Sequence, residues 1–190
     1  MTVLALHGFR QNGKIMKDKL KRLGIDAICP DGPLVVDKEN NLLGWWKLEV
    51  PAGEKVKSYI TKPHKYEGFE DTVTFLKATV ALNDVTIIIG FSQGAVLATL
   101  LLNHHLLPHV QKVLILSGSP IMDKELIRTG KISVPMLSLV GVRDEITDQR
   151  LALELSQLYV SSQLGTHNSG HVIPSDSSTK ETIKLFLEGK

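Results

Sequence analysis

Cysteine is almost missing from this chain, which has Cys29 as the only one among 190 residues. A single cysteine can form neither an internal disulfide framework nor a cysteine-rich zinc site. Cys29 stands before Pro30 at the end of an apolar run, so we interpret it as a core residue and not as a nucleophile. The low cysteine content and the lack of signal-peptide features near residue 1 lead us to expect a cytoplasmic location.

An excess of charge is missing too. The chain has 22 basic and 20 acidic side chains, a formal net charge of +2 with neutral histidines. This balance gives no electrostatic basis for a nucleic-acid partner, and none is expected. No apolar run approaches the roughly 20 residues of a membrane-spanning helix, so stable membrane insertion is not expected. His104, His105 and His109 have no second ligand cluster in support, so neither a metal nor another cofactor is expected.

Short apolar runs rich in β-branched residues alternate along the chain with helical patterns. The runs predict strands at 3–6, 25–29, 85–89, 113–116, 134–140 and 161–167. The helical patterns lie at 12–23, 69–82, 93–107 and 148–159, and a final helix follows a capping box at Ser178 and Glu181. This alternation predicts an α/β fold, with a mostly parallel central sheet and helices on both faces. The length suits a single domain spanning residues 1–190.

One long segment, residues 37–66, breaks the alternation and contains both tryptophans. Loops of this length in a compact domain are usually functional or disordered. Trp45, Trp46 and Tyr66 therefore have two interpretations, because aromatic rings could line a substrate pocket or attach the segment to the core. Both interpretations stay open from the residues alone, as does the oligomeric state.

The strongest local signal is Gly90-Phe91-Ser92-Gln93-Gly94, which follows a predicted strand and begins a predicted helix. That strand–turn–helix setting is typical of the G-x-S-x-G nucleophile elbow. Gly90 and Gly94 leave room for a strained turn that raises the serine above the sheet at a helix N-terminus. We therefore predict that Ser92 is a nucleophile and not an ordinary N-cap.

A serine nucleophile needs a base, and the base needs an acid that orients it. In this arrangement the chain order is serine, acid, histidine. Asp144 follows a predicted strand and is the preferred acid over Glu145 and Asp148, since Asp148 is better explained as a charge at a helix N-terminus. His171 is the preferred base, because it follows the last predicted strand, whereas His167 lies inside that strand.

An oxyanion hole needs two backbone N–H donors. The residue after the nucleophile, Gln93, should supply one of them. The other should come from the loop after the first strand, where Gly8 lets the backbone approach closely and Phe9 offers its amide.

Five motifs occur in order along nearly the whole chain: Leu6-His7-Gly8-Phe9-Arg10-Gln11-Asn12-Gly13, Tyr66-Glu67-Gly68-Phe69-Glu70, Gly90-Phe91-Ser92-Gln93-Gly94-Ala95, Gly141-Val142-Arg143-Asp144 and Gly170-His171-Val172-Ile173-Pro174. In this combination the chain resembles the FSH-type serine hydrolases of the α/β-hydrolase superfamily. It departs from the family's usual two glycines before the base, having Ser169-Gly170, which removes no catalytic group.

The resemblance implies a Ser92–Asp144–His171 triad, an oxyanion hole at Phe9 and Gln93, and carboxylesterase-like activity on a small-molecule or acyl ester. We expect cleavage through an acyl-enzyme intermediate. Two alternatives remain: a thioesterase or acyl-protein deacylase with the same triad, and a non-catalytic ligand-binding protein that kept the fold. Segment 37–66 falls where the family varies, so the resemblance implies little about acyl preference.

Overall fold

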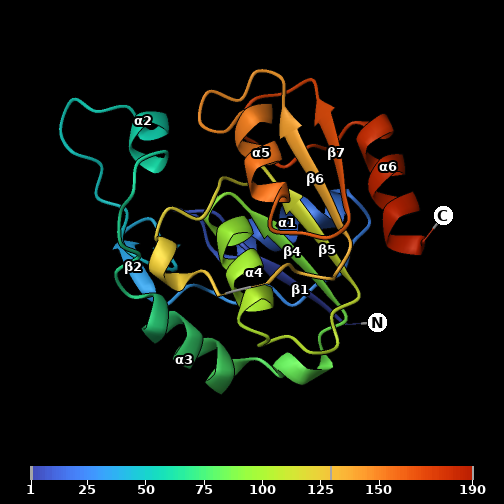
Figure 1. The fold of residues 1–190 in the computed structure, drawn as a ribbon, viewed down its shortest axis with the longest axis horizontal. Helices are drawn as coiled ribbons and strands as arrows, with labels where there is room; N and C mark the ends of the chain where they lie inside the picture. The colour runs from blue at the N-terminus through green and yellow to red at the C-terminus, as the bar shows by residue number, and fades with distance from the viewer. Residues whose placement is uncertain (1, 129, 190) are drawn as a thin grey trace.

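A parallel sheet forms the centre of the protein in the computed structural model, which describes residues 2–128 and 130–189 (Figure 1). Within these residues the sheet has five strands, in the spatial order β1 (Val3–Leu6), β4 (Ile87–Phe91), β5 (Lys112–Leu116), β6 (Met136–Gly141) and β7 (Ser162–His167). All neighbouring strands are parallel. The runs of aliphatic residues explain the centre of the sheet, because β4 and β6 are buried at every residue and covered on both faces.

Helices cover both faces of this sheet, as the alternation predicts. They are α1 (Gly13–Arg22), α3 (Phe69–Thr79), α4 (Gln93–Asn103), α5 (Gln149–Ser156) and α6 (Ser177–Glu188). Met16 of α1 and Ile183 of α6 belong to one apolar cluster. Leu76 of α3, Leu97 of α4 and Leu155 of α5 belong to the other, so the sheet separates two cores. None of the helices in the described ranges is long and apolar enough to cross a membrane.

The segment between α1 and α3 is more ordered than a loop. It contains the antiparallel pair β2 (Leu34–Asp37) and β3 (Leu42–Gly44), followed by the short helix α2 (Val56–Ile60). Figure 1 shows α2 and its connecting loops standing apart from the helices that cover the sheet. In the part of the chain that the structure describes, two 3-10 turns complete the elements, at Leu82–Asp84 and Lys124–Leu126.

Two local predictions are wrong. The predicted strand at 25–29 is a single parallel bridge between Ile28 and Leu4, because Pro30 has no amide hydrogen with which to continue the ladder. The predicted capping box at Ser178 and Glu181 is replaced by an N-cap two residues earlier. There the Asp176 carboxylate accepts hydrogen bonds from the amide and hydroxyl of Thr179, at 2.9 and 2.7 Å.

Candidate active site

Ser92 lies in a sharp turn between β4 and α4. Its backbone has φ of 53° and ψ of −115°, a conformation that residues other than glycine seldom adopt. The turn is tight enough to exclude side chains on either side: a Cβ at Gly90 would lie 2.4 Å from the carbonyl oxygen of Gly94, and one at Gly94 would lie 2.2 Å from that of Leu6. The two glycines therefore permit the strained turn that presents the Ser92 hydroxyl above the carboxyl edge of the sheet.

A chain of hydrogen bonds joins Ser92 to His171 and Asp144. The Ser92 Oγ lies 2.9 Å from Nε2 of His171, and Nδ1 of the same ring lies 2.8 and 3.0 Å from the two carboxylate oxygens of Asp144. An ionised carboxylate can only accept, so Nδ1 donates to it and Nε2 is left to accept the serine hydroxyl. The three residues come from loops after β4, β6 and β7, which end at the same edge of the sheet.

The Asp144 carboxylate is held by donors that the sequence did not indicate. The backbone amides of Ile146 and Thr147 donate to Oδ1, at 2.9 and 2.8 Å. The hydroxyls of Ser117 and Thr147 donate to Oδ2, at 2.8 and 2.9 Å. Burial raises the pKa of Asp144, but hydrogen bonds from His171, Thr147 and Ile146 outweigh it and hold the pKa well below its usual range. Asp144 therefore stays an anion that orients His171.

Ser117 is the least expected of these donors. It is fully buried directly after β5, with a φ of 50°. A polar residue at the carboxyl end of a central parallel strand was the one signal that could have indicated it, because such ends meet at the same edge of the sheet.

The Gly8–Phe9 loop lies directly against the nucleophile. A Cβ at Gly8 would lie 2.9 Å from Cδ1 of Phe91 and 3.3 Å from the Cβ of Ser92, so any larger residue here would crowd the nucleophile turn. Among the described residues, the amides of Phe9 and Gln93 have no hydrogen-bond acceptor. Two unpaired amides beside the serine can stabilise a negative oxygen.

His7 holds the Gly8–Phe9 loop in place through two hydrogen bonds of its buried ring. It is fully buried; its Nδ1 donates to the Gly8 carbonyl at 2.8 Å, and its Nε2 accepts from the Gly32 amide at 2.9 Å. Burial lowers the pKa of His7, and this outweighs the opposing effects of the Gly8 carbonyl and Asp31. The ring therefore stays neutral, which keeps its acceptor nitrogen available to Gly32.

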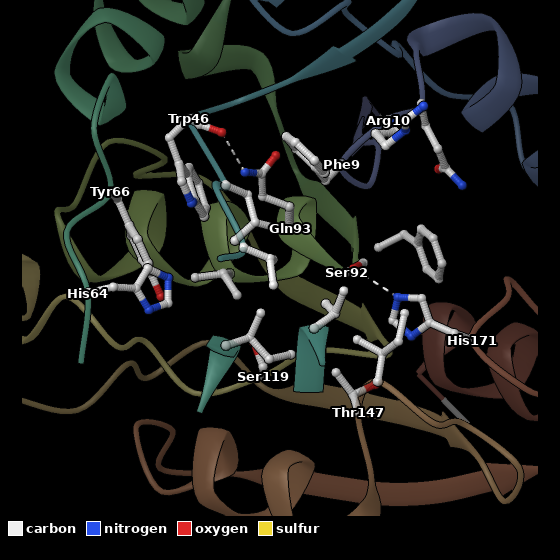
Figure 2. Close-up of a pocket in the computed structure, with 18 residues that line it drawn as sticks. Phe9, Arg10, Trp46, His64, Tyr66, Ser92, Gln93, Ser119, Thr147 and His171 are labelled. Carbon is white, nitrogen blue, oxygen red and sulfur yellow. Dashed lines mark hydrogen bonds between the residues drawn. The ribbon is translucent and has the colours of Figure 1, made fainter. Parts of the chain in front are cut away.

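The side chain of Gln93 connects the nucleophile turn to segment 37–66. Its Oε1 accepts from the Trp45 amide at 3.0 Å, and its Nε2 donates to the Trp46 carbonyl at 2.9 Å (Figure 2). Sequence reasoning assigned Gln93 only a backbone role and missed this contact. The Trp45 ring lies in the core, where its Nε1 donates to the His7 carbonyl at 2.8 Å, and it is not among the side chains that line the neighbouring cavity.

A cavity of about 330 Å³ opens beside Ser92. Its walls are mainly apolar, and most of them come from segment 37–66, with further residues from the loop after β1, the end of β4, α4 and the loop after β6. The apolar lining residues are Phe9, Trp46, Leu48, Val50, Val56, Ile60, Tyr66, Phe91, Val96 and Ile146. Figure 2 shows His64 and Tyr66 on the side of the cavity away from Ser92 and His171. The Tyr66 ring stacks on that of Trp46 at 4.5 Å, so these two aromatics both line the cavity and pack together.

The rival acid and base lie outside this hydrogen-bonded chain. Asp148 is the N-cap of α5, where its carboxylate accepts from the Leu151 amide at 2.9 Å, and Glu145 is exposed. His167 is buried, and neither ring nitrogen has a hydrogen-bond partner among the described residues. Within residues 2–128 and 130–189 there is no group of three or more histidine, cysteine or acidic side chains that could hold a metal ion.

Comparison with known proteins gives a consistent set of relatives. The model of the family described as "Serine hydrolase (FSH1)" matches residues 1–183. Esterase AAEL000016 of Aedes aegypti is 26% identical over 211 residues, which cover 99% of this chain and 76% of that protein. Esterase OVCA2 of Homo sapiens is 26% identical over 219 residues, covering 99% of this chain and 96% of its own length.

Among solved structures, the carboxylesterase from Mesorhizobium loti superposes with a TM-score of 0.71 at 19% identity. The superposition covers 100% of this chain and 89% of that one. At this identity the likeness shows a shared fold, and it agrees with the parallel sheet described above. The predicted α/β-hydrolase fold is confirmed.

Proposed function

This chain belongs to the FSH1 family of serine hydrolases, and from that premise we propose that it hydrolyses carboxylic esters through an acyl-enzyme intermediate. The observation that carries the proposal is the hydrogen-bonded chain from Ser92 through His171 to Asp144, which ends at an apolar cavity. The relatives named as esterases support the choice of esters as substrates.

In the first step, Ser92 Oγ attacks the ester carbonyl while Nε2 of His171 takes the hydroxyl proton. Asp144 stabilises the imidazolium that forms, and the amides of Phe9 and Gln93 donate to the oxyanion. His171 then returns the proton to the departing alkoxide, which leaves as the alcohol and leaves the acyl group on Ser92. In the second step Nε2 of His171 takes a proton from a water molecule, which attacks the acyl carbonyl. The bond between Ser92 Oγ and the acyl group then breaks, His171 returns the proton to Ser92 Oγ, and the carboxylic acid leaves.

The proposal includes the place where the acyl group binds. The cavity beside Ser92 has apolar walls, and segment 37–66 contributes Trp46 and Tyr66 to them. Because burying an apolar chain is favourable and burying a charged group without a partner is costly, such walls favour an alkyl chain over a polar one. We extend the proposal to a cytoplasmic location, supported by the single cysteine.

The decisive experiment replaces Ser92 with alanine. Ser92→Ala should abolish hydrolysis of p-nitrophenyl esters and labelling by a fluorophosphonate probe, while circular dichroism shows an intact fold. Ser178→Ala, at an exposed serine on α6, is the matched control and should keep full activity. Ester hydrolysis that survives in Ser92→Ala would contradict the proposal. A wild-type protein that neither hydrolyses esters nor reacts with the probe would instead be a non-catalytic binding protein, and parallel thioester assays would identify a thioesterase.

A further inference from the structure

Helix α2 contributes to the cavity without belonging to the core. It has five residues, none of them buried, and its N-cap residue Lys55 makes no side-chain capping bond. A helix this short is not stable by itself in water, so its position depends on contacts with the rest of the protein. Val56 and Ile60 nevertheless line the cavity, together with Leu48 and Val50 from the same segment. The apolar side chains of α2 thus form part of the cavity wall, although the helix itself has no buried residue.

Within the described ranges, a single ion pair connects α2 to the loop after β6. Lys57 Nζ lies 2.9 Å from Oδ2 of Asp148, with the two side chains 39% and 35% exposed. Asp148 directly follows Ile146 and Thr147, which line the cavity on the side of Asp144. The contact with Lys57 is the largest of the effects that lower the pKa of Asp148, ahead of the amide of Leu151 and the more distant charge of Arg150. The pair therefore joins α2 to the loop that carries the acid.

We propose that Lys57 and Asp148 determine acyl-chain specificity by closing α2 over the cavity, so that the site takes esters of medium-chain carboxylic acids. The inference rests on the proposed ester hydrolysis and names its substrate class. At about 30 Å³ for a group the size of a water molecule or a methylene, 330 Å³ holds about ten such groups. That corresponds to acyl chains of roughly six to ten carbons.

The contribution of the ion pair should depend on the acyl chain. An acetyl group has too few carbons to fill the cavity and so depends little on its walls, whereas an octanoyl chain fills the cavity and depends on the wall formed by Val56 and Ile60 to exclude water. Each added methylene that is buried should raise kcat/KM about fourfold until the cavity is full. A half-exposed ion pair is weak enough for α2 to open and admit substrate. It is also strong enough to change the ratio of molecules with α2 closed to molecules with α2 open about two- to fivefold.

The test measures kcat/KM for p-nitrophenyl acetate, butyrate, octanoate and dodecanoate. Lys57→Gln removes the cation, and Asp148→Asn removes the anion while keeping an oxygen that still caps α5. Each variant should lower the octanoate-to-acetate ratio about two- to fivefold. The double variant should lower it no further, because the two residues act through one contact. Lys55→Gln, at an exposed lysine next to α2 without an ion pair among the described residues, should keep the wild-type ratio.

A second measurement separates this inference from the proposed function. In a Ser92→Ala background, the Kd of methyl octanoate can be followed without any turnover through the change in tryptophan fluorescence, because Trp46 lines the cavity. Adding Lys57→Gln should raise that Kd about two- to fivefold, whether or not the wild-type protein hydrolyses esters. Three results would each overturn the proposal. The first is an unchanged octanoate-to-acetate ratio and an unchanged Kd in both single variants, and the second is a double variant in which the two effects on the ratio add up. The third is a Lys55→Gln variant that lowers the ratio as much as Lys57→Gln does.

Discussion

Replacing Asp144 with asparagine tests whether its charge, and not only its shape, organises the site. The backbone amides of Ile146 and Thr147 donate to Oδ1, so the asparagine must place its carbonyl oxygen there. Its NH₂ group then takes the place of Oδ2. The hydroxyls of Ser117 and Thr147 at that position can rotate and accept, so the asparagine fits without a buried unpaired amide.

The functional consequence follows from His171. The NH₂ group would donate to Nδ1, which lies 2.8 Å from the original Oδ2, and the ring would then carry its proton on Nε2. A protonated Nε2 cannot accept the Ser92 hydroxyl, so the base is lost although every side chain stays in place. Equivalent exchanges in triads of this kind reduce kcat by about 10⁴-fold, or about 5 kcal/mol of transition-state stabilisation.

The assay measures kcat for p-nitrophenyl butyrate and the rate of fluorophosphonate labelling. Both should fall in parallel in the Asp144→Asn variant. The midpoint of thermal unfolding checks that the fold is intact. Asp176→Asn is the matched control, because asparagine also caps a helix and Asp176 is the N-cap of α6. A loss of less than tenfold in a folded Asp144→Asn protein would refute the reasoning, since the carboxylate would then have no role in fixing the His171 proton.

Two further predictions concern stability, each measured as the free energy of unfolding in urea. Burial lowers the pKa of His167, so the unfolded chain binds a proton that the native state does not, and stability falls as pH drops below about 6.5. His167→Leu also removes two unpaired buried nitrogens, so it should stabilise by about 1 kcal/mol at pH 8 and by more at pH 5.5; an equal or smaller gain at pH 5.5 would contradict this. Gly94→Ala should destabilise by about 3 kcal/mol, because its methyl group would lie 2.2 Å from the Leu6 carbonyl. Gly24→Ala, at an open position with positive φ, should cost roughly 1 kcal/mol, and equal losses at both glycines would refute the steric argument.

The sequence indicated the fold because its signals were local and repeated. Aliphatic runs without polar alternation predicted the buried strands β4 and β6, and the predicted sheet and flanking helices are confirmed. The same kind of signal was wrong at residues 25–29, where an apolar run ends at Pro30 and pairs through one residue only. A hydrophobic pattern gives the tendency to form a strand, but the number of available partners decides whether a ladder forms.

By itself, the sequence placed Ser92, Asp144 and His171 directly after three of the predicted strands, and parallel strands end at one edge of a sheet. That topological rule was enough to predict their proximity, which the structure shows at 2.8 and 2.9 Å. Only the tertiary structure decided how the site is supported. Three of its contacts join residues that are 27 to 91 positions apart in the sequence. They are the hydrogen bond from Ser117 to Asp144, the hydrogen bond from Gln93 to Trp46, and the ion pair between Lys57 and Asp148. Such contacts depend on how loops pack against one another, and no periodicity or short motif encodes that packing.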